Sequence, residues 1–223
     1  GLLSLTLLVL IVKAVVLAPV STSGTATVTS SQQILFTFTT STNDTSKVFG
    51  FASSTDGITW TVTTTQATST IVEGVGKAFM FNGLTTNTLY YFRVGAGDEA
   101  TSSTYPFAST TAYTLADTPG TPTVTSTANQ TMKVIINSST NPAATLFVVR
   151  DTASSTRTLY LQSDQTWSTA TATFTAVQLG AINGTTTVGL ATNTLHIISV
   201  AAVNGNSVTT TYGAGAAGVY TYA

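Results

Sequence analysis

The stretch GLTTNTLYYFRV at Gly83–Val94 returns 106 residues later as GLATNTLHIISV at Gly189–Val200, with seven of the twelve positions identical in register. Chance does not easily produce such a match, and self-similarity at a fixed spacing is the mark of an internal repeat. A weaker match accompanies it, because DGITW at Asp56–Trp60 resembles DQTW at Asp164–Trp167. The sequence therefore predicts two copies of one structural unit.

The boundaries of the two copies follow from the stretch between them. LADTPGTP at Leu115–Pro122 contains the Pro and Gly residues that are typical of a linker. We expect an apolar segment over residues 1–20, a first unit over 25–115 and a second unit over 119–223. Units of about 100 residues have the size of β-sandwich domains.

Composition narrows both the fold and the function. Threonine and serine occupy 51 and 22 of the 223 positions, and charged residues make up only 7%. Threonine is β-branched and favours strands over helices, so an all-helical fold is excluded. The net charge is −1 without a basic cluster, so no nucleic-acid partner is expected. Because the chain has no cysteine and one histidine, disulfides, thiol nucleophiles and histidine metal clusters are also excluded. We expect no enzymatic activity and no cofactor.

Hydrophobic alternation with a period of two predicts strands in both copies. Ile34, Phe36 and Phe38 are expected to share one face of the first such strand. The other expected strands cover residues 47–52, 77–81, 89–96 and 107–113 in the first copy, and 132–136, 145–149, 158–161, 170–176, 195–202 and 207–212 in the second. Short strands at this spacing, separated by turn signals, favour β-sandwiches.

The repeated segment resembles a known family. LTTNTLYYFRVGAGDEATSS and its counterpart LATNTLHIISVAAVNGNSVT are similar to the end of a fibronectin type III domain, where a Leu, a turn, an aromatic residue and a Val lead into a polar hairpin. Tyr90 occupies the position at which that family keeps a core tyrosine, whereas the second copy has His196 there. The resemblance implies immunoglobulin-like sandwiches that act as spacers or binding modules, and it implies no catalytic activity.

The segment GLLSLTLLVLIVKAVVLAPV at Gly1–Val20 is apolar apart from Lys13 and a few small polar residues. Eighteen residues make a helix of roughly 27 Å, and we expect a helix that packs against copies of itself. A secretory signal peptide, a membrane anchor and a strand inserted into a neighbouring sandwich are the alternatives. The residues expected to form the assembly contacts are Leu2, Leu3, Leu5, Leu7, Leu8, Leu10, Ile11, Lys13, Val15 and Leu17.

This segment also resembles the exposed apolar helix of type IV pilins and related archaeal filament subunits, although Leu5 stands where bacterial type IV pilins characteristically carry Glu. The resemblance implies a pilus-like filament. The expected fold class is therefore mainly β, with an N-terminal hydrophobic α-helix followed by two tandem immunoglobulin-like or fibronectin III-like sandwiches. The expected function is that of a structural subunit of an extracellular filament, with copies of itself as partners and membrane contact before assembly. A membrane-anchored surface adhesin is the alternative.

Few side chains point to a chemical site. His196 is expected to be a core or edge residue, and Trp60 and Trp167 are expected to be core residues rather than exposed sugar-binding platforms. The adjacent carboxylates Asp98 and Glu99 provide too few oxygen ligands for calcium. Each of the four Asn-X-Ser/Thr sequences could accept a glycan, although roughly three such sequences are expected by chance in a chain so rich in Thr and Ser, and O-linked sugar on Thr and Ser stays open as well. The candidate acceptors are Asn43, Asn129, Asn137 and Asn183.

Overall fold

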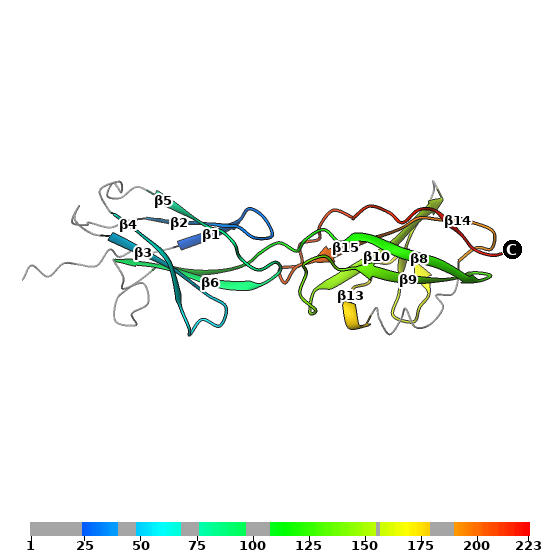
Figure 1. Ribbon diagram of the computed structural model, residues 1–223, viewed down its shortest axis with the longest axis horizontal. Coiled ribbons are helices and arrows are strands. Elements are labelled where there is room, and N and C mark those ends of the chain that lie inside the picture. Colours follow the sequence, from blue (N-terminus) through cyan, green and yellow to red (C-terminus); the bar gives the residue numbers. More distant parts are fainter. Residues whose placement is uncertain (1–23, 40–47, 68–75, 97–107, 155–156, 179–189) are drawn as a thin grey trace, which may run out of the picture.

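The chain forms two β-sandwiches that lie end to end along the longest axis of the molecule, with the C-terminus at the far end of the second (Figure 1). Nearly all regular structure is β, in keeping with the abundance of β-branched threonine. The computed structural model describes residues 24–39, 48–67, 76–96, 108–154, 157–178 and 190–223.

The first sandwich packs a three-stranded sheet against a four-stranded sheet, and every strand pair is antiparallel. The smaller sheet has the order β1 (Gly24–Val28), β2 (Ile34–Thr39) and β5 (Gly76–Phe81). The larger sheet has the order β4 (Thr61–Ala67), β3 (Val48–Ser54), β6 (Leu89–Ala96) and β7 (Ala108–Tyr113).

The second sandwich is less regular. β8 (Gly120–Ala128) pairs with β9 (Thr131–Asn137). In the larger sheet, β10 (Leu146–Ser154) pairs with β11 (Arg157–Leu161), β13 (Phe174–Thr175) and β15 (Ile198–Val203), and β12 (Trp167–Ser168) pairs with β11. A separate pair joins β14 (Leu195–His196) to β16 (Val219–Tyr220).

Each sandwich has its own hydrophobic core. The first core is aromatic, and the prediction that Ile34, Phe36 and Phe38 share a buried face is confirmed, because none of them is more than 3% exposed. The rings of Phe36 and Phe81 meet edge to face, with centroids 6.4 Å apart, a favourable geometry for two aromatic side chains. The second core is mainly aliphatic, built from residues that include Phe147, Val149, Leu161, Ile198 and Val200.

The expected fold class is wrong in one respect, the N-terminal helix. Among the described residues there is no helix of seven or more residues, and helical geometry is confined to residues 176–178 after β13. Strand-forming Thr, Val and Phe dominate these residues, so their local preference agrees with the sheets. The segment over residues 1–20 lies outside the described residues, and the fold class is all-β sandwich.

Candidate functional site

The repeated sequence builds the same turn in each sandwich. In the first Thr-Asn-Thr turn, Thr86-Asn87-Thr88, Asn87 has a φ of 42°, a left-handed conformation that Asn tolerates better than most residues. The hydroxyl of Thr114, directly after β7, accepts the Thr88 N–H at 3.0 Å and donates to the Thr85 carbonyl at 2.7 Å. Thr114 is fully buried, so its hydroxyl fixes the turn to the last strand in a site that excludes water.

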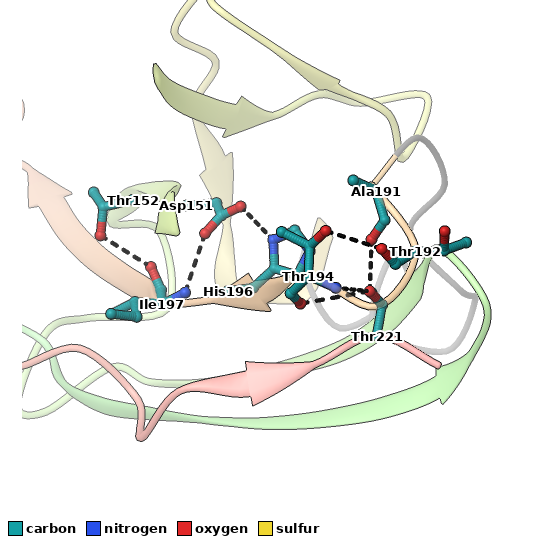
Figure 2. Close-up of polar contacts among 8 residues, drawn as sticks. All are labelled: Asp151, Thr152, Ala191, Thr192, Thr194, His196, Ile197 and Thr221. Carbon is teal, nitrogen blue, oxygen red and sulfur yellow. Dashed lines mark hydrogen bonds and ion pairs between the residues drawn. The ribbon is translucent and has the colours of Figure 1, made fainter. Parts of the chain in front are cut away.

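The second Thr-Asn-Thr turn, Thr192-Asn193-Thr194, repeats these hydrogen bonds (Figure 2). Asn193 has a φ of 50°. The buried hydroxyl of Thr221, directly after β16, accepts the Thr194 N–H at 3.1 Å and donates to the Ala191 carbonyl at 2.5 Å. The sequence repeat therefore encodes a turn that is fixed by the threonine directly after the last strand of each sandwich.

The strand after the first turn carries the predicted core tyrosine, and this prediction is confirmed. The side chain of Tyr90 is 8% exposed, and its phenol oxygen accepts the Thr85 N–H at 2.9 Å. A tyrosine that bonds to backbone a few residues upstream is the tyrosine corner found in immunoglobulin-like sandwiches. Tyr90 therefore stabilises the turn that precedes its own strand.

His196 takes the place of Tyr90 in the second sandwich. It is buried, as predicted for a core histidine, and its Nδ1 lies 2.6 Å from Oδ2 of Asp151 on β10 (Figure 2). Oδ1 of Asp151 accepts the Ile197 N–H at 3.1 Å, and the strand is interrupted at Ile197 between β14 and β15. His196 Nε2 is buried without a hydrogen-bond partner among the described residues, so no described hydroxyl is placed for activation as in a catalytic triad. The pair links β14 to β10 in the interior of the second sandwich.

The first turn also forms the contact between the two sandwiches. Its side chains reach three residues of the second sandwich: the Thr86 and Thr140 hydroxyls lie 3.1 Å apart, and Asn87 Nδ2 donates to Thr145 Oγ1 at 2.8 Å. Asn87 Oδ1 accepts the Gly205 N–H at 2.9 Å. Both ends of one amide side chain are therefore used to join the sandwiches.

The linker between the sandwiches also forms hydrogen bonds with the second sandwich. Asn141 of the second sandwich is buried, and its Oδ1 accepts the Asp117 N–H at 2.8 Å. Its Nδ2 donates to the carbonyls of Asp117 and Ser138, both at 2.8 Å. The Thr140 hydroxyl donates to the Asp117 carboxylate. The backbone that connects the sandwiches thus has side-chain partners on the second sandwich.

Close packing completes the junction. A methyl group added at Gly205 would overlap the ring of Tyr113, so this glycine permits the close approach of the two sandwiches. Asn204, which is buried, donates from Nδ2 to the Thr114 carbonyl at 3.2 Å. A groove beside these residues has a volume of about 180 Å³, which is below the roughly 300–1,000 Å³ of small-molecule pockets. The junction is suited to holding two domains together.

The remaining predicted site residues are only partly described. All ten expected assembly residues, together with Asn43, Asn183, Asp98 and Glu99, lie outside the described residues. Asn129 is exposed in the turn between β8 and β9, and Asn137 is exposed at the end of β9 with its Oδ1 accepting the Ser139 N–H at 3.1 Å. Both described acceptor sequences therefore lie at the surface.

The two tryptophans differ from each other. Trp167 is buried, as predicted. Trp60 is half-buried and lies under the guanidinium of Arg93, which is 3.9 Å from the centroid of the Trp60 ring, so the prediction of a core residue is wrong for Trp60.

The described part of the chain contains no group of three or more His, Cys, Asp or Glu side chains that could hold a metal ion. It also contains no helix that is long and apolar enough to cross a membrane.

Comparisons with known proteins bear on the fold. Residues 21–109 match the sequence model of the purple acid phosphatase N-terminal domain. No curated protein matches the chain. Two solved structures are similar to the chain. The fibronectin domains FN1–FN3 of chicken CNTN1 share 15% sequence identity with it, over 92% of this chain and 68% of that chain, with a TM-score of 0.35. The sensor domain of the anti-sigma factor RsgI4 of Pseudobacteroides cellulosolvens shares 12% sequence identity, over 42% of this chain and 91% of that chain, with a TM-score of 0.33. The sheet arrangement of the first sandwich and its tyrosine corner are those of a fibronectin type III-like fold.

Proposed function

We propose that the chain is a non-catalytic structural subunit of an extracellular homopolymer, in which the two sandwiches form a stiff outer arm. The observation that carries this proposal is the junction. Domains in one chain move relative to each other by default unless their interface is extensive. Here Asn87, Asn141 and Asn204 form hydrogen bonds between the first sandwich or the linker and the second sandwich. A fixed arm of this kind suits a structural subunit.

Two features of the sequence support a polymer. Residues 1–18 are almost entirely apolar, and burial of apolar surface against other copies contributes about 25 cal/mol per Å². The low share of charged residues, 7%, lets neighbouring sandwiches approach without strong like-charge repulsion. Exposed Asn129 offers a position at which a glycan would increase the solubility of such a surface.

Negative-stain electron microscopy of the native material, washed free of detergent, tests the proposal. Uniform filaments are the expected result, and deletion of residues 1–18 should abolish them. Lys13→Leu should change filament formation, because it removes the one charge of the segment. Lys133→Leu on the exposed side of β9 is the matched control and should leave the filaments unchanged. Single particles that need detergent or lipid would overturn the proposal in favour of a membrane-anchored adhesin.

A further inference from the structure

The first sandwich has a pocket that the proposed function does not use. It lies between the loop that joins β3 to β4 and the start of β6, and its volume is about 360 Å³. This volume is at the small end of the roughly 300–1,000 Å³ that is typical of small-molecule pockets. In Figure 1 the loop, drawn in cyan, projects from the side of the first sandwich, and the second sandwich does not overlie it. The lining residues are Ser53, Ser54, Thr55, Asp56, Thr59, Thr61 and Tyr90.

Hydroxyl groups dominate the lining of this pocket. Six of its seven side chains carry one, and a hydroxyl group both donates and accepts hydrogen bonds. The hydroxyls of Ser53, Thr55 and Thr61 form no hydrogen bond with another described residue. The Tyr90 phenol oxygen accepts the Thr85 N–H at 2.9 Å, and its own O–H remains as a donor. The pocket therefore offers a ligand both donors and acceptors.

The seventh lining side chain is a carboxylate that its own loop holds in place. Oδ1 of Asp56 accepts the Ile58 and Thr59 N–H groups at 2.8 and 2.7 Å and the Ser54 hydroxyl at 2.7 Å. These hydrogen bonds hold the pKa of the Asp56 carboxyl well below its ordinary value of 3.8, so the group is ionised at neutral pH. Because the donors fix the carboxylate before a ligand arrives, binding loses little conformational entropy at this residue.

We propose that this pocket binds one neutral sugar ring, a hexopyranoside. Each hydroxyl of a sugar donates and accepts, so it matches the mixed donors and acceptors of the lining, and the Asp56 carboxylate accepts from the sugar hydroxyls. An ammonium group fits less well, because it has no acceptor for the Tyr90 O–H. An anion would be repelled by Asp56, and an apolar ligand would leave the hydroxyl groups of the lining without partners.

The corresponding place in the second sandwich is closed by its own side chains. Asp151 and His196 stand at the positions of Ser53 and Tyr90, and they bond to each other at 2.6 Å. Both are buried, so they leave no polar group for a ligand in the way that the first copy does. The site is therefore assigned to the first sandwich alone. The inference goes beyond the proposed function, because a single copy has the whole site; a polymer would present many such sites and bind a sugar-coated surface with increased avidity.

Trp60 provides a signal for binding, because it lies between the lining residues Thr59 and Thr61. The full chain with Trp167→Phe is dispersed in a detergent without a sugar headgroup and titrated with the methyl glycosides of mannose, glucose, galactose and N-acetylglucosamine. We expect a saturable change in Trp60 fluorescence with at least one of them. Saturation-transfer NMR on the same samples shows directly which sugar protons contact the protein.

Two substitutions and a matched control locate the binding. Asp56→Asn keeps the oxygen that caps the loop but removes the charge and one acceptor, and it should weaken binding roughly tenfold. Thr61→Val keeps the shape of an exposed strand residue and removes one hydroxyl, so a loss of roughly threefold is expected. Asp164→Asn makes the same change in the loop before Trp167 of the second sandwich and should leave binding unchanged.

Several results would overturn the inference. They are no binding of any glycoside in the panel, undiminished binding in both pocket variants, glycerol binding as tightly as the sugars, and n-butylammonium chloride binding in their place. Filaments that bind no glycoside would overturn the inference and leave the proposed function standing. Glycoside binding by dispersed copies that form no filaments would support the sugar site while the polymer proposal fails.

Discussion

The two sandwiches fix the same strand in different ways. In the first, Tyr90 bonds to Thr85 in its own turn, and β6 runs without interruption from Leu89 to Ala96. In the second, His196 bonds across the sheet to Asp151, and the strand is broken at Ile197 because its N–H donates to the Asp151 carboxylate. The Thr-Asn-Thr turns, by contrast, are the same in both copies.

The register shows which residue of the first copy corresponds to Asp151. Ser53 pairs with Phe92 on β6, and Asp151 pairs with Ile198 on β15, at the counterpart position. At these two positions the first copy has Ser53 and Tyr90, whereas the second copy has Asp151 and His196. The comparison teaches that both copies share the Thr-Asn-Thr turn and the threonine that fixes it. The partner of the next polar side chain differs, because Tyr90 bonds to the turn itself whereas His196 bonds to Asp151 on another strand.

The largest effect is expected from Asp151→Ala. It leaves His196 buried without its carboxylate and removes the acceptor of the Ile197 N–H, and loss of one partner of a buried pair typically costs about 3–5 kcal/mol. Urea unfolding followed by Trp167 fluorescence, in a Trp60→Phe background, reports on the second sandwich alone.

The same assay tests whether the two pairs are interchangeable. Asp151→Ser combined with His196→Tyr installs the pair of the first copy. We expect the double variant to be more stable than the sum of the two single changes predicts, because neighbouring residues of one network are coupled. Strict additivity would contradict the correspondence between the two pairs.

The next largest loss of stability is expected when the threonine that fixes each Thr-Asn-Thr turn is changed. Thr114→Val and Thr221→Val keep the shape of the side chain but remove a buried hydroxyl that accepts one N–H and donates to one carbonyl. Leaving such groups unsatisfied costs about 1–3 kcal/mol, and we expect similar losses in the two sandwiches. Thr→Ser at each position, which keeps the hydroxyl, is the control. A loss confined to one sandwich in urea unfolding would show that the turns are not equivalent.

A smaller effect is expected from Tyr90→Phe. Only the hydrogen bond to the Thr85 N–H is removed, while the ring stays in the core, so the first sandwich should lose about 1 kcal/mol. Trp60 fluorescence in a Trp167→Phe background measures this change. Tyr91→Phe, on the opposite face of the strand, is the matched control. An equal effect of both substitutions would contradict the tyrosine corner.

Much of the first sandwich could be predicted from the sequence. The expected strands over 77–81, 89–96 and 107–113 differ from the observed β5, β6 and β7 by no more than one residue at either end. Alternation of apolar and polar residues was a sufficient signal there, because each strand has one buried face.

The second sandwich departs from the prediction where glycines gather. The strand expected over 207–212 is an extended segment that runs along β15, with single hydrogen bonds such as Gly213 N–H to the Val200 carbonyl. A side chain at Gly213 would overlap the Pro119 carbonyl, so close packing against the linker, rather than strand pairing, determines this segment. Periodicity alone does not report such a contact.

The junction could not be predicted, although its residues lie in the repeat. Thr86 and Thr140 are 54 positions apart, and Asn87 and Gly205 are 118 apart, so only the folded arrangement brings them together. Before folding, Asn87 and Asn193 are indistinguishable members of a repeated turn. Their difference is positional, because one is covered by a sandwich and the other is exposed.

The smallest effect is expected at acidic pH, and it compares the loops at Asp56 and Asp164. The N–H groups of Ile58 and Thr59 and the Ser54 hydroxyl donate to Asp56, and they hold the pKa of its carboxyl well below the ordinary value of 3.8. The hydroxyl and N–H of Thr166 lower the pKa of Asp164 in the same direction.

Because the pKa of Asp56 is lower in the folded than in the unfolded chain, its stabilising contribution is present above pH of about 4 and is lost as the pH falls further. Asp56→Asn should therefore reduce the acid dependence of the unfolding free energy of the first sandwich, measured by Trp60 fluorescence between about pH 5 and pH 3. Asp164→Asn should leave that dependence unchanged and reduce the one measured at Trp167. An unchanged slope in the Asp56 variant would show that this loop does not couple protonation to folding.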